Sequence, residues 1–154
     1  MEEQFGQIKK LLEKNGIEYM AREHAPVYTS EDAARIRGEE LKTGVKALIF
    51  KSKNDFFLAL VSGDKKIDTK KLRLMTGDDM HLANPQDVLE CTGCEIGSVH
   101  PIGNLMKVKY VYADKRIFEN EFVNFNAGLH TVSIRMRSKD LKKVVNPEIA
   151  DYAK

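Results

Sequence analysis

Apolar residues recur at helical spacing near the start of the chain. From Phe5 to Leu12 they mark one helical face, and Asn15-Gly16 follows as a stop signal, so we expect an amphipathic helix over residues 3–15. Residues with capping chemistry predict four shorter helices. These begin at Thr29 or Ser30, at Asp68, at Asn84-Pro85 and at Ser138.

The middle of the chain has the composition of β-strands. Residues 45–53 and 56–62 are rich in β-branched and aromatic side chains and are separated by Asn54-Asp55, which predicts a hairpin. Further strands are expected at residues 17–23, 80–83, 105–113, 122–126 and 130–137. About six or seven strands with short helices, without a regular βαβ period, predict a mixed α/β fold of the α+β kind with a mixed sheet.

Length and composition are those of one globular domain. The chain has 154 residues, of which 42% are hydrophobic and 31% charged, so we expect a single domain over residues 1–154. No apolar run approaches the roughly 18 residues of a membrane span. The first four residues lack the basic and then apolar pattern of a signal peptide, so a cytoplasmic protein without a membrane partner is expected.

The net charge of +2 gives no argument for nucleic-acid binding, but the basic residues gather in two places. Each cluster offers cations to a phosphate backbone, although such runs are more often a solvated face. The first comprises Lys65, Lys66, Lys70, Lys71 and Arg73, and the second Arg135, Arg137, Lys139, Lys142 and Lys143.

Cys91 and Cys94 form a Cys-x-x-Cys motif. A structural zinc site needs a second ligand pair, and none is present in the sequence. A redox pair would need a βαβ context, which is missing at this point. We therefore interpret the two cysteines as small residues on either side of Gly93.

Residues 94–104 contain two glycines and a proline between apolar segments and predict a shaped loop. Gly97 and Gly103 permit backbone angles or close approaches that other residues do not, and Pro101 fixes its own φ. The loop is either a structural turn or a rigid array of backbone N–H groups, which suits a carbonyl oxygen or a phosphate.

The segment from Gly97 to Pro101 resembles the Gly-x-x-x-Pro loop of the YbaK/prolyl-tRNA-synthetase-associated family, whose members hydrolyse wrongly charged aminoacyl-tRNAs. Other pieces follow in the family's order. They are residues 24–31, 44–48, 128–134 and 140–141. The resemblance implies a sheet curled into a barrel-like core with helices packed around it.

Lys46 and His130 each have two interpretations. Lys46 lies among apolar residues of a predicted strand, so its ammonium either reaches water along its own stem or meets an anion. His130 begins a strand and is either structural or lines a pocket. The resemblance favours the pocket for both. No Ser-His-Asp pattern surrounds Ser98, which we expect to bind rather than to attack.

We expect a site without a metal or a cofactor, whose residues follow from the resemblance. Its expected catalytic residues are Lys46, Gly97, Ser98, Pro101 and His130, and its expected substrate-binding residues are Thr29, Val99, His100, Gly103 and Gly128. Hydrolysis of an aminoacyl ester needs no protein nucleophile, so the loop backbone would align the ester and stabilise its oxyanion.

Two functions remain open at this point. One is a freestanding deacylase that removes a small amino acid from the acceptor 3′ end of a mischarged tRNA. The other is a non-catalytic module that binds the tRNA 3′ end or an aminoacyl-tRNA synthetase. The removed amino acid could be cysteine, proline, alanine, serine or threonine. Ala47 argues against alanine, because some alanine-clearing relatives have a polar side chain there.

Overall fold

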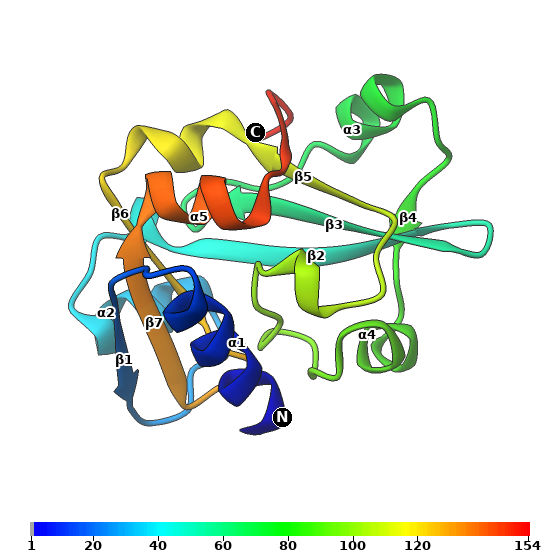
Figure 1. Ribbon diagram of the computed structural model, residues 1–154. Coiled ribbons are helices and arrows are strands. Elements are labelled where there is room, and N and C mark those ends of the chain that lie inside the picture. The colour runs from blue at the N-terminus through cyan, green and yellow to red at the C-terminus, as the bar shows by residue number, and fades with distance from the viewer. Residues whose placement is uncertain (1) are drawn as a thin grey trace.

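The computed structural model describes residues 2–154, in which eight strands form two separate sheets (Figure 1). One sheet has three antiparallel strands in the order β1-β7-β6, and the other has five strands in the order β4-β2-β3-β5-β8. The strands are β1 (Tyr19–Glu23), β2 (Val45–Ser52), β3 (Asp55–Ser62), β4 (His81–Leu82), β5 (Tyr110–Asp114), β6 (Phe122–Asn126), β7 (Val132–Arg137) and β8 (Glu148–Ala150).

Short helices surround the two sheets. The α-helices are α1 (Glu2–Lys14), α2 (Ser30–Arg37), α3 (Thr69–Thr76), α4 (Pro85–Thr92) and α5 (Ser138–Val145). Three 3₁₀ helices complete the set, namely η1 (Leu41–Thr43), η2 (Gly103–Leu105) and η3 (Lys115–Glu119). Within residues 2–154, no helix has both the length and the apolar character needed to cross a bilayer.

The mixed α/β fold is confirmed, but the barrel-like closure is not. Strand β3 pairs with β2 antiparallel and with β5 parallel, so the larger sheet is mixed as expected. The strands nevertheless form two open sheets, which meet at an isolated bridge between Gly44 and Asn124. This meeting point lies where β2 begins beside β6.

Most element boundaries agree with the sequence-based predictions. Thr29 caps α2 by accepting the Asp32 N–H at 3.0 Å, and Gly38 closes the helix with a left-handed φ of 67°. In the hairpin turn, Lys53 takes the positive φ of 57° that a glycine would otherwise supply.

In the C-terminal half, two predictions are wrong and one strand was missed. Ser138 does not cap α5, because its hydroxyl donates to the Asn120 carbonyl. The strand expected at residues 105–113 is confined to β5, since its first residue belongs to η2. The short strand β8 was not predicted, because exposed residues leave it without an alternating pattern.

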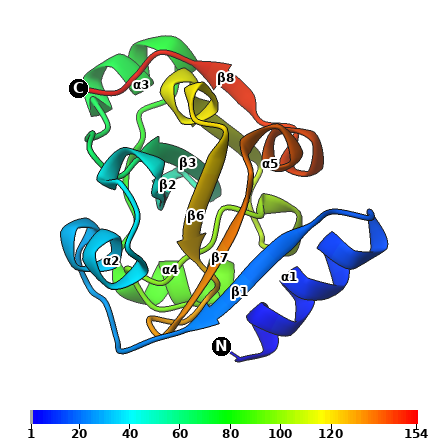
Figure 2. The same cartoon turned by 90° about the vertical axis from the view of Figure 1, so that its left-hand side faces the viewer.

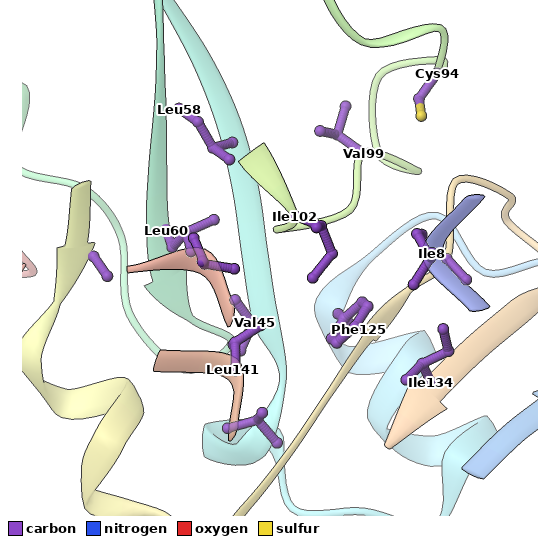
Figure 3. Packing of buried hydrophobic residues seen from close by; sticks show 14 of the residues in the cluster. Ile8, Val45, Leu58, Leu60, Cys94, Val99, Ile102, Phe125, Ile134 and Leu141 are labelled. Atoms are coloured by element: carbon purple, nitrogen blue, oxygen red, sulfur yellow. The ribbon is translucent and has the colours of Figure 1, made fainter. Parts of the chain in front are cut away.

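The hydrophobic core lies between the two sheets and α1 (Figure 3). Ile8 of α1, Leu60 of β3 and Phe125 of β6 are all fully buried in it. Helices α1 and α2 lie on opposite sides of the three-stranded sheet (Figure 2). The α1 side is apolar, whereas the α2 side carries Asn124, Asn126 and Ser133.

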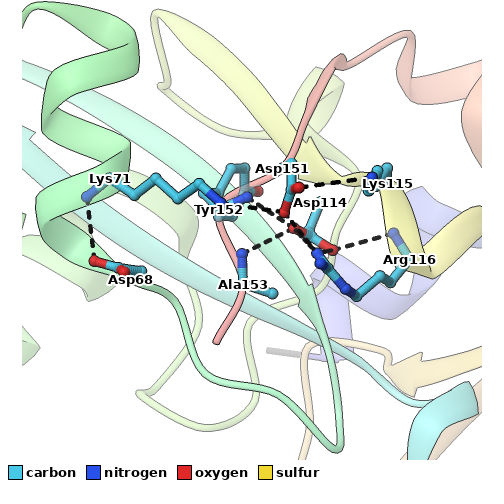
Figure 4. Close-up of polar contacts among 8 residues, drawn as sticks. All are labelled: Asp68, Lys71, Asp114, Lys115, Arg116, Asp151, Tyr152 and Ala153. Atoms are coloured by element: carbon cyan, nitrogen blue, oxygen red, sulfur yellow. Dashed lines mark hydrogen bonds and ion pairs between the residues drawn. The ribbon is translucent and has the colours of Figure 1, made fainter.

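A buried carboxylate ties the C-terminal segment to β5 (Figure 4). Asp114 is fully buried and accepts the backbone N–H groups of Tyr152 and Ala153, each at 2.9 Å. Arg116 contacts both Asp114 oxygens and reaches Asp151 at 2.8 Å. We call Asp114, Arg116, Asp151 and Tyr152 the C-terminal latch.

Candidate functional site

A pocket of about 190 Å³ lies between α2, the start of β2, β6 and the loop that contains Gly97. Helix α2, strand β6 and the start of β2 are at the left of Figure 1. Small residues such as Ala33 and Ala47 leave the space open, and Asn124 and Asn126 give one wall polar groups. Both predicted motifs, the lysine segment and the glycine loop, contribute to its lining.

Lys46 lines this pocket from the second position of β2. Its ammonium donates to the Lys65 carbonyl. Burial lowers the pKa of Lys46, and the charge of Lys66 lowers it further, whereas the charges of Glu31 and Asp64 raise it. Among residues 3–154, no carboxylate lies within 4.0 Å of the Lys46 Nζ. The pocket therefore contains a partly desolvated cation without a counterion.

The loop carrying Gly97 turns sharply into the pocket wall. Gly97 has a φ of 88°, and a Cβ there would lie 3.2 Å from Cε1 of His130. Both observations explain the glycine, because a side chain would be strained and crowded. The N–H and the hydroxyl of Ser98 both donate to the Glu95 carbonyl, at 3.0 and 2.9 Å.

These contacts determine which N–H groups of the loop are available. The Ser98 N–H is used within the turn, and Pro101 has none. The described part of the chain provides no hydrogen-bond acceptor for the N–H of Gly97 or Val99, two residues that line the pocket. Gly97 and Val99 are therefore the donors left for a bound oxygen atom.

His130 lies beside the loop but is not among the pocket-lining residues. Its Nδ1 is 3.0 Å from the Val27 carbonyl, which can only accept, so Nδ1 carries the proton. Its Nε2 is 3.6 Å from Glu95, and its ring is 4.6 Å from that of Tyr28. His130 thus packs behind Gly97 and Tyr28.

The remaining predicted residues are divided between the pocket and the core. Thr29 and Val99 line the pocket, whereas Ser98, Pro101, His100 and Gly103 are buried outside it. A Cβ on Gly103 would lie 2.3 Å from Cγ2 of Val111, so this glycine serves packing. Gly128, with a φ of 86°, forms the turn between β6 and β7.

His100 faces α1 rather than the pocket. Its Nδ1 accepts the Ile102 N–H at 3.1 Å, so Nε2 carries the proton and donates to Gln4 at 3.0 Å. Burial lowers the pKa of His100 to about 4. The ring is therefore neutral near pH 7 and connects the loop to the first helix.

The sequence analysis missed Arg37, which ends α2 and lines the pocket. Its three nitrogens donate to Ser133 Oγ, Asn124 Oδ1 and Asn126 Oδ1 at 2.8, 2.7 and 2.9 Å. Burial lowers its pKa to about 10. The pattern Asn124-Phe125-Asn126 was the available signal, since two amides on one face of an apolar strand need polar partners.

The two cysteines are both buried, and burial raises the pKa of the Cys91 thiol to about 11. Unreactive thiols are expected from such surroundings. Across residues 3–154, no group of three or more His, Cys, Asp or Glu side chains is arranged to hold a metal ion.

Comparison with known proteins identifies the family. The family model described as the aminoacyl-tRNA editing domain matches residues 24–144. The chain is 32% identical over 148 residues to the multifunctional Ser/Thr-tRNA deacylase ProXp-y of Escherichia coli, a match that covers 92% of this chain and 88% of that protein. It is also 40% identical over 96 residues to a proline-tRNA ligase of Thermosipho melanesiensis, covering 61% of this chain and 17% of the ligase.

Solved structures agree with this result. A crystal structure described as that of a candidate trans-editing enzyme for prolyl tRNA synthetase superposes with a TM-score of 0.88 at 27% identity, covering 98% of this chain and 97% of that one. The protein therefore belongs to the aminoacyl-tRNA editing domain family.

Proposed function

We propose that this protein is an aminoacyl-tRNA deacylase that hydrolyses the ester of a mischarged tRNA carrying a small amino acid. One observation carries the proposal: in a member of the editing family, one small pocket is lined by a lysine without a carboxylate partner and by two loop residues whose N–H groups have no acceptor among the described residues. A cation and an array of N–H donors are what an anionic RNA end and an ester carbonyl need.

Lys46 binds the phosphate or the polar groups of the terminal nucleotide. Its strand holds the ammonium in a partly desolvated place, where Coulomb attraction to a phosphate is stronger than in bulk water. A nucleotide phosphate supplies the counterion that the described residues do not provide.

The N–H groups of Gly97 and Val99 stabilise the oxyanion. Water adds to the ester carbonyl carbon, the bond to the ribose oxygen breaks, and the ribose oxygen takes up a proton as it leaves. During the addition, negative charge develops on the carbonyl oxygen, where one aligned donor contributes about 3 kcal/mol. His130 lies beside the loop and leaves no room for a side chain at Gly97, since a Cβ there would be 3.2 Å from its Cε1.

The pocket supports a small and polar amino acid. A volume of about 190 Å³ leaves little room for a large side chain, and the lining residue Thr29, whose hydroxyl accepts the Asp32 N–H, still has a hydroxyl proton to donate. A hydroxyl on the substrate gains hydrogen bonds that an apolar analogue leaves unmade. Together with the Ser/Thr-tRNA deacylase among the relatives, this favours serine and threonine over cysteine, proline and alanine.

The alternative function is a non-catalytic module that binds the tRNA 3′ end or a synthetase. It uses the same pocket, and the match to a segment of proline-tRNA ligases makes a synthetase a reasonable partner. We further propose that residues 1–154 form one editing domain, because residues of both sheets share one core. We propose that this domain is cytoplasmic.

A deacylation assay separates the two functions. Purified protein is mixed in excess with a panel of tRNAs charged with serine, threonine, alanine, cysteine or proline, and release of the amino acid is followed in a single turnover. We expect the fastest release from seryl- or threonyl-tRNA. Binding of these tRNAs without release above the rate without protein would favour the non-catalytic module.

A further inference from the structure

Arg37 is held in the pocket wall by neutral groups alone. The hydrogen bonds of its three guanidinium nitrogens go to the hydroxyl of Ser133 and to the side-chain carbonyls of Asn124 and Asn126. In the part of the chain that the structure describes, no carboxylate oxygen lies within 4.0 Å of this guanidinium. A buried arginine is usually paired, so the fold keeps this cation for something other than an ion pair.

Asn126 connects Arg37 to the glycine loop. Arginine can only donate, so the Asn126 atom facing it is Oδ1, which leaves Nδ2 pointing the other way. Nδ2 donates to the Gly97 carbonyl at 2.7 Å. The other side of the same peptide group is the Ser98 N–H, which is bonded to Glu95. Both ends of the Gly97–Ser98 peptide are therefore fixed.

Asn124 forms a second connection from Arg37, toward the opposite wall of the pocket. Its Oδ1 accepts from the guanidinium at 2.7 Å, and its Nδ2 donates to Thr43 Oγ1 at 2.9 Å. Thr43 directly precedes Gly44, which forms the isolated bridge to Asn124 of β6. Lys46 follows Gly44 by two residues. One guanidinium thus orients two amides, and the amides hold the two walls.

We propose that Arg37 is a positioning residue that sets the glycine loop and the Lys46 strand against each other through Asn126 and Asn124. The inference rests on the proposed deacylase function for its effect on rate. Arg37 holds the groups that contact the substrate and does not itself take part in the reaction.

The geometry requires arginine rather than a general cation. A planar guanidinium with donors on three nitrogens can reach three acceptors at once, whereas a lysine ammonium is a point charge on a flexible stem. Arg37→Lys keeps the charge and loses the simultaneous contacts. The matched control is Arg35→Lys on the same helix, because the Arg35 side chain is 75% exposed and its ion pair is with Asp32, its neighbour on α2.

Single-turnover deacylation with excess protein tests the effect on rate. We expect Arg37→Lys to lower the rate constant at saturating protein by roughly tenfold, the size of one well-made hydrogen bond, with little change in the half-saturating concentration. Asn126→Ala should lower it by a similar factor, and the double variant little further, because the two residues act through one connection. A wild-type rate for Arg37→Lys, or losses that multiply in the double variant, would overturn the proposal.

Asn126→Asp separates positioning from stability. A carboxylate gives Arg37 a counterion but cannot donate to the Gly97 carbonyl. We expect an unchanged or raised melting temperature together with a rate lowered roughly tenfold. If the protein were as active with aspartate as with asparagine, the bond to Gly97 would have no role and the proposal would fail.

The amide resonances of the loop give a readout that does not depend on activity. Arg37→Lys should shift the ¹H–¹⁵N signals of Gly97, Ser98 and Val99, and Arg35→Lys should leave them unchanged. If the wild-type protein hydrolyses no charged tRNA, the proposed function fails, and these signals alone decide whether Arg37 sets the loop. Unshifted loop signals would contradict the positioning role.

Discussion

The pocket and the C-terminal latch each centre on one arginine, and the two arginines have opposite surroundings. Arg116 contacts the carboxylates of Asp114 and Asp151, whose hydrogen bonds raise its pKa. Arg37 has only neutral acceptors, and burial lowers its pKa to about 10. A cation paired within the chain stabilises the fold, whereas one without a counterion marks the region where an outside ligand or a precise backbone geometry is needed.

The largest effect is expected from removing the paired carboxylate. Asp114→Ala leaves the backbone N–H groups of Arg116, Tyr152 and Ala153 without this acceptor, and the Arg116 guanidinium with one partner fewer. We expect the free energy of unfolding to fall by about 3–5 kcal/mol. Urea denaturation measures it, and Asp55→Ala, at an exposed ion pair with Lys109, is the control. If Asp114→Ala were as stable as the control variant, the latch would not stabilise the fold.

The core-facing side of the glycine loop should make stability depend on pH. His100 has a pKa of about 4 in the folded protein and about 6.5 when unfolded, so the unfolded chain binds a proton first as the pH falls. This contribution is fully present above pH 6.5 and is lost progressively toward pH 4, by about 3 kcal/mol in all. The free energy of unfolding, measured between pH 7 and pH 4, should depend much less on pH in His100→Gln than in the wild type. An equal slope in both proteins would contradict the assignment.

Within the pocket, Gly97→Ala should reduce catalysis more than stability. The methyl group meets His130 and the φ of 88° becomes strained, which costs slightly more than about 1 kcal/mol in folding. A displaced N–H donor lowers the rate roughly 100-fold. Ser98→Ala is the control, because its hydroxyl only contacts Glu95. Single-turnover rates and thermal melting compare the two. A larger rate loss in Ser98→Ala would show that the loop works through a side chain.

The smallest effect is expected at the exposed edge of the latch. Arg116 lowers the pKa of Asp151 to about 2, so its contribution to stability is present above pH 4 and disappears as the pH falls through 2. Asp151→Asn should lower the melting temperature slightly at neutral pH and not at all below pH 2. A difference between the two proteins that persists in strong acid would require another cause.

Local signals predicted most elements and the two motifs of the pocket. The Thr29 cap, the hairpin at residues 45–62 and the positive φ of Gly97 follow from the chemistry of neighbouring residues. The separation into two sheets does not, because pairing between distant strands leaves no local pattern. For the same reason β8 was missed, since three residues beside β5 carry no period of their own.

The candidate site was predictable only in part. Sequence patterns identify Lys46 and Gly97, but they do not show which face of the loop is inside. Ser98 and His100 lie within three residues of Gly97 in sequence, and yet both are fully buried. Arg37 contacts Asn124, Asn126 and Ser133, which follow it in the sequence by 87, 89 and 96 positions. Only the folded chain therefore reveals its role.

The most direct test of the account compares one lysine from each region. Lys46 has no carboxylate within 4.0 Å among residues 3–154, whereas Lys71 pairs with Asp151 in the latch at 3.4 Å. In single-turnover deacylation at saturating protein, Lys46→Ala should lose at least about tenfold in rate while its melting temperature changes little, since its charge contacts the substrate. Lys71→Ala should keep the wild-type rate. If Lys46→Ala hydrolyses the charged tRNA as fast as the wild type, the central claim is wrong.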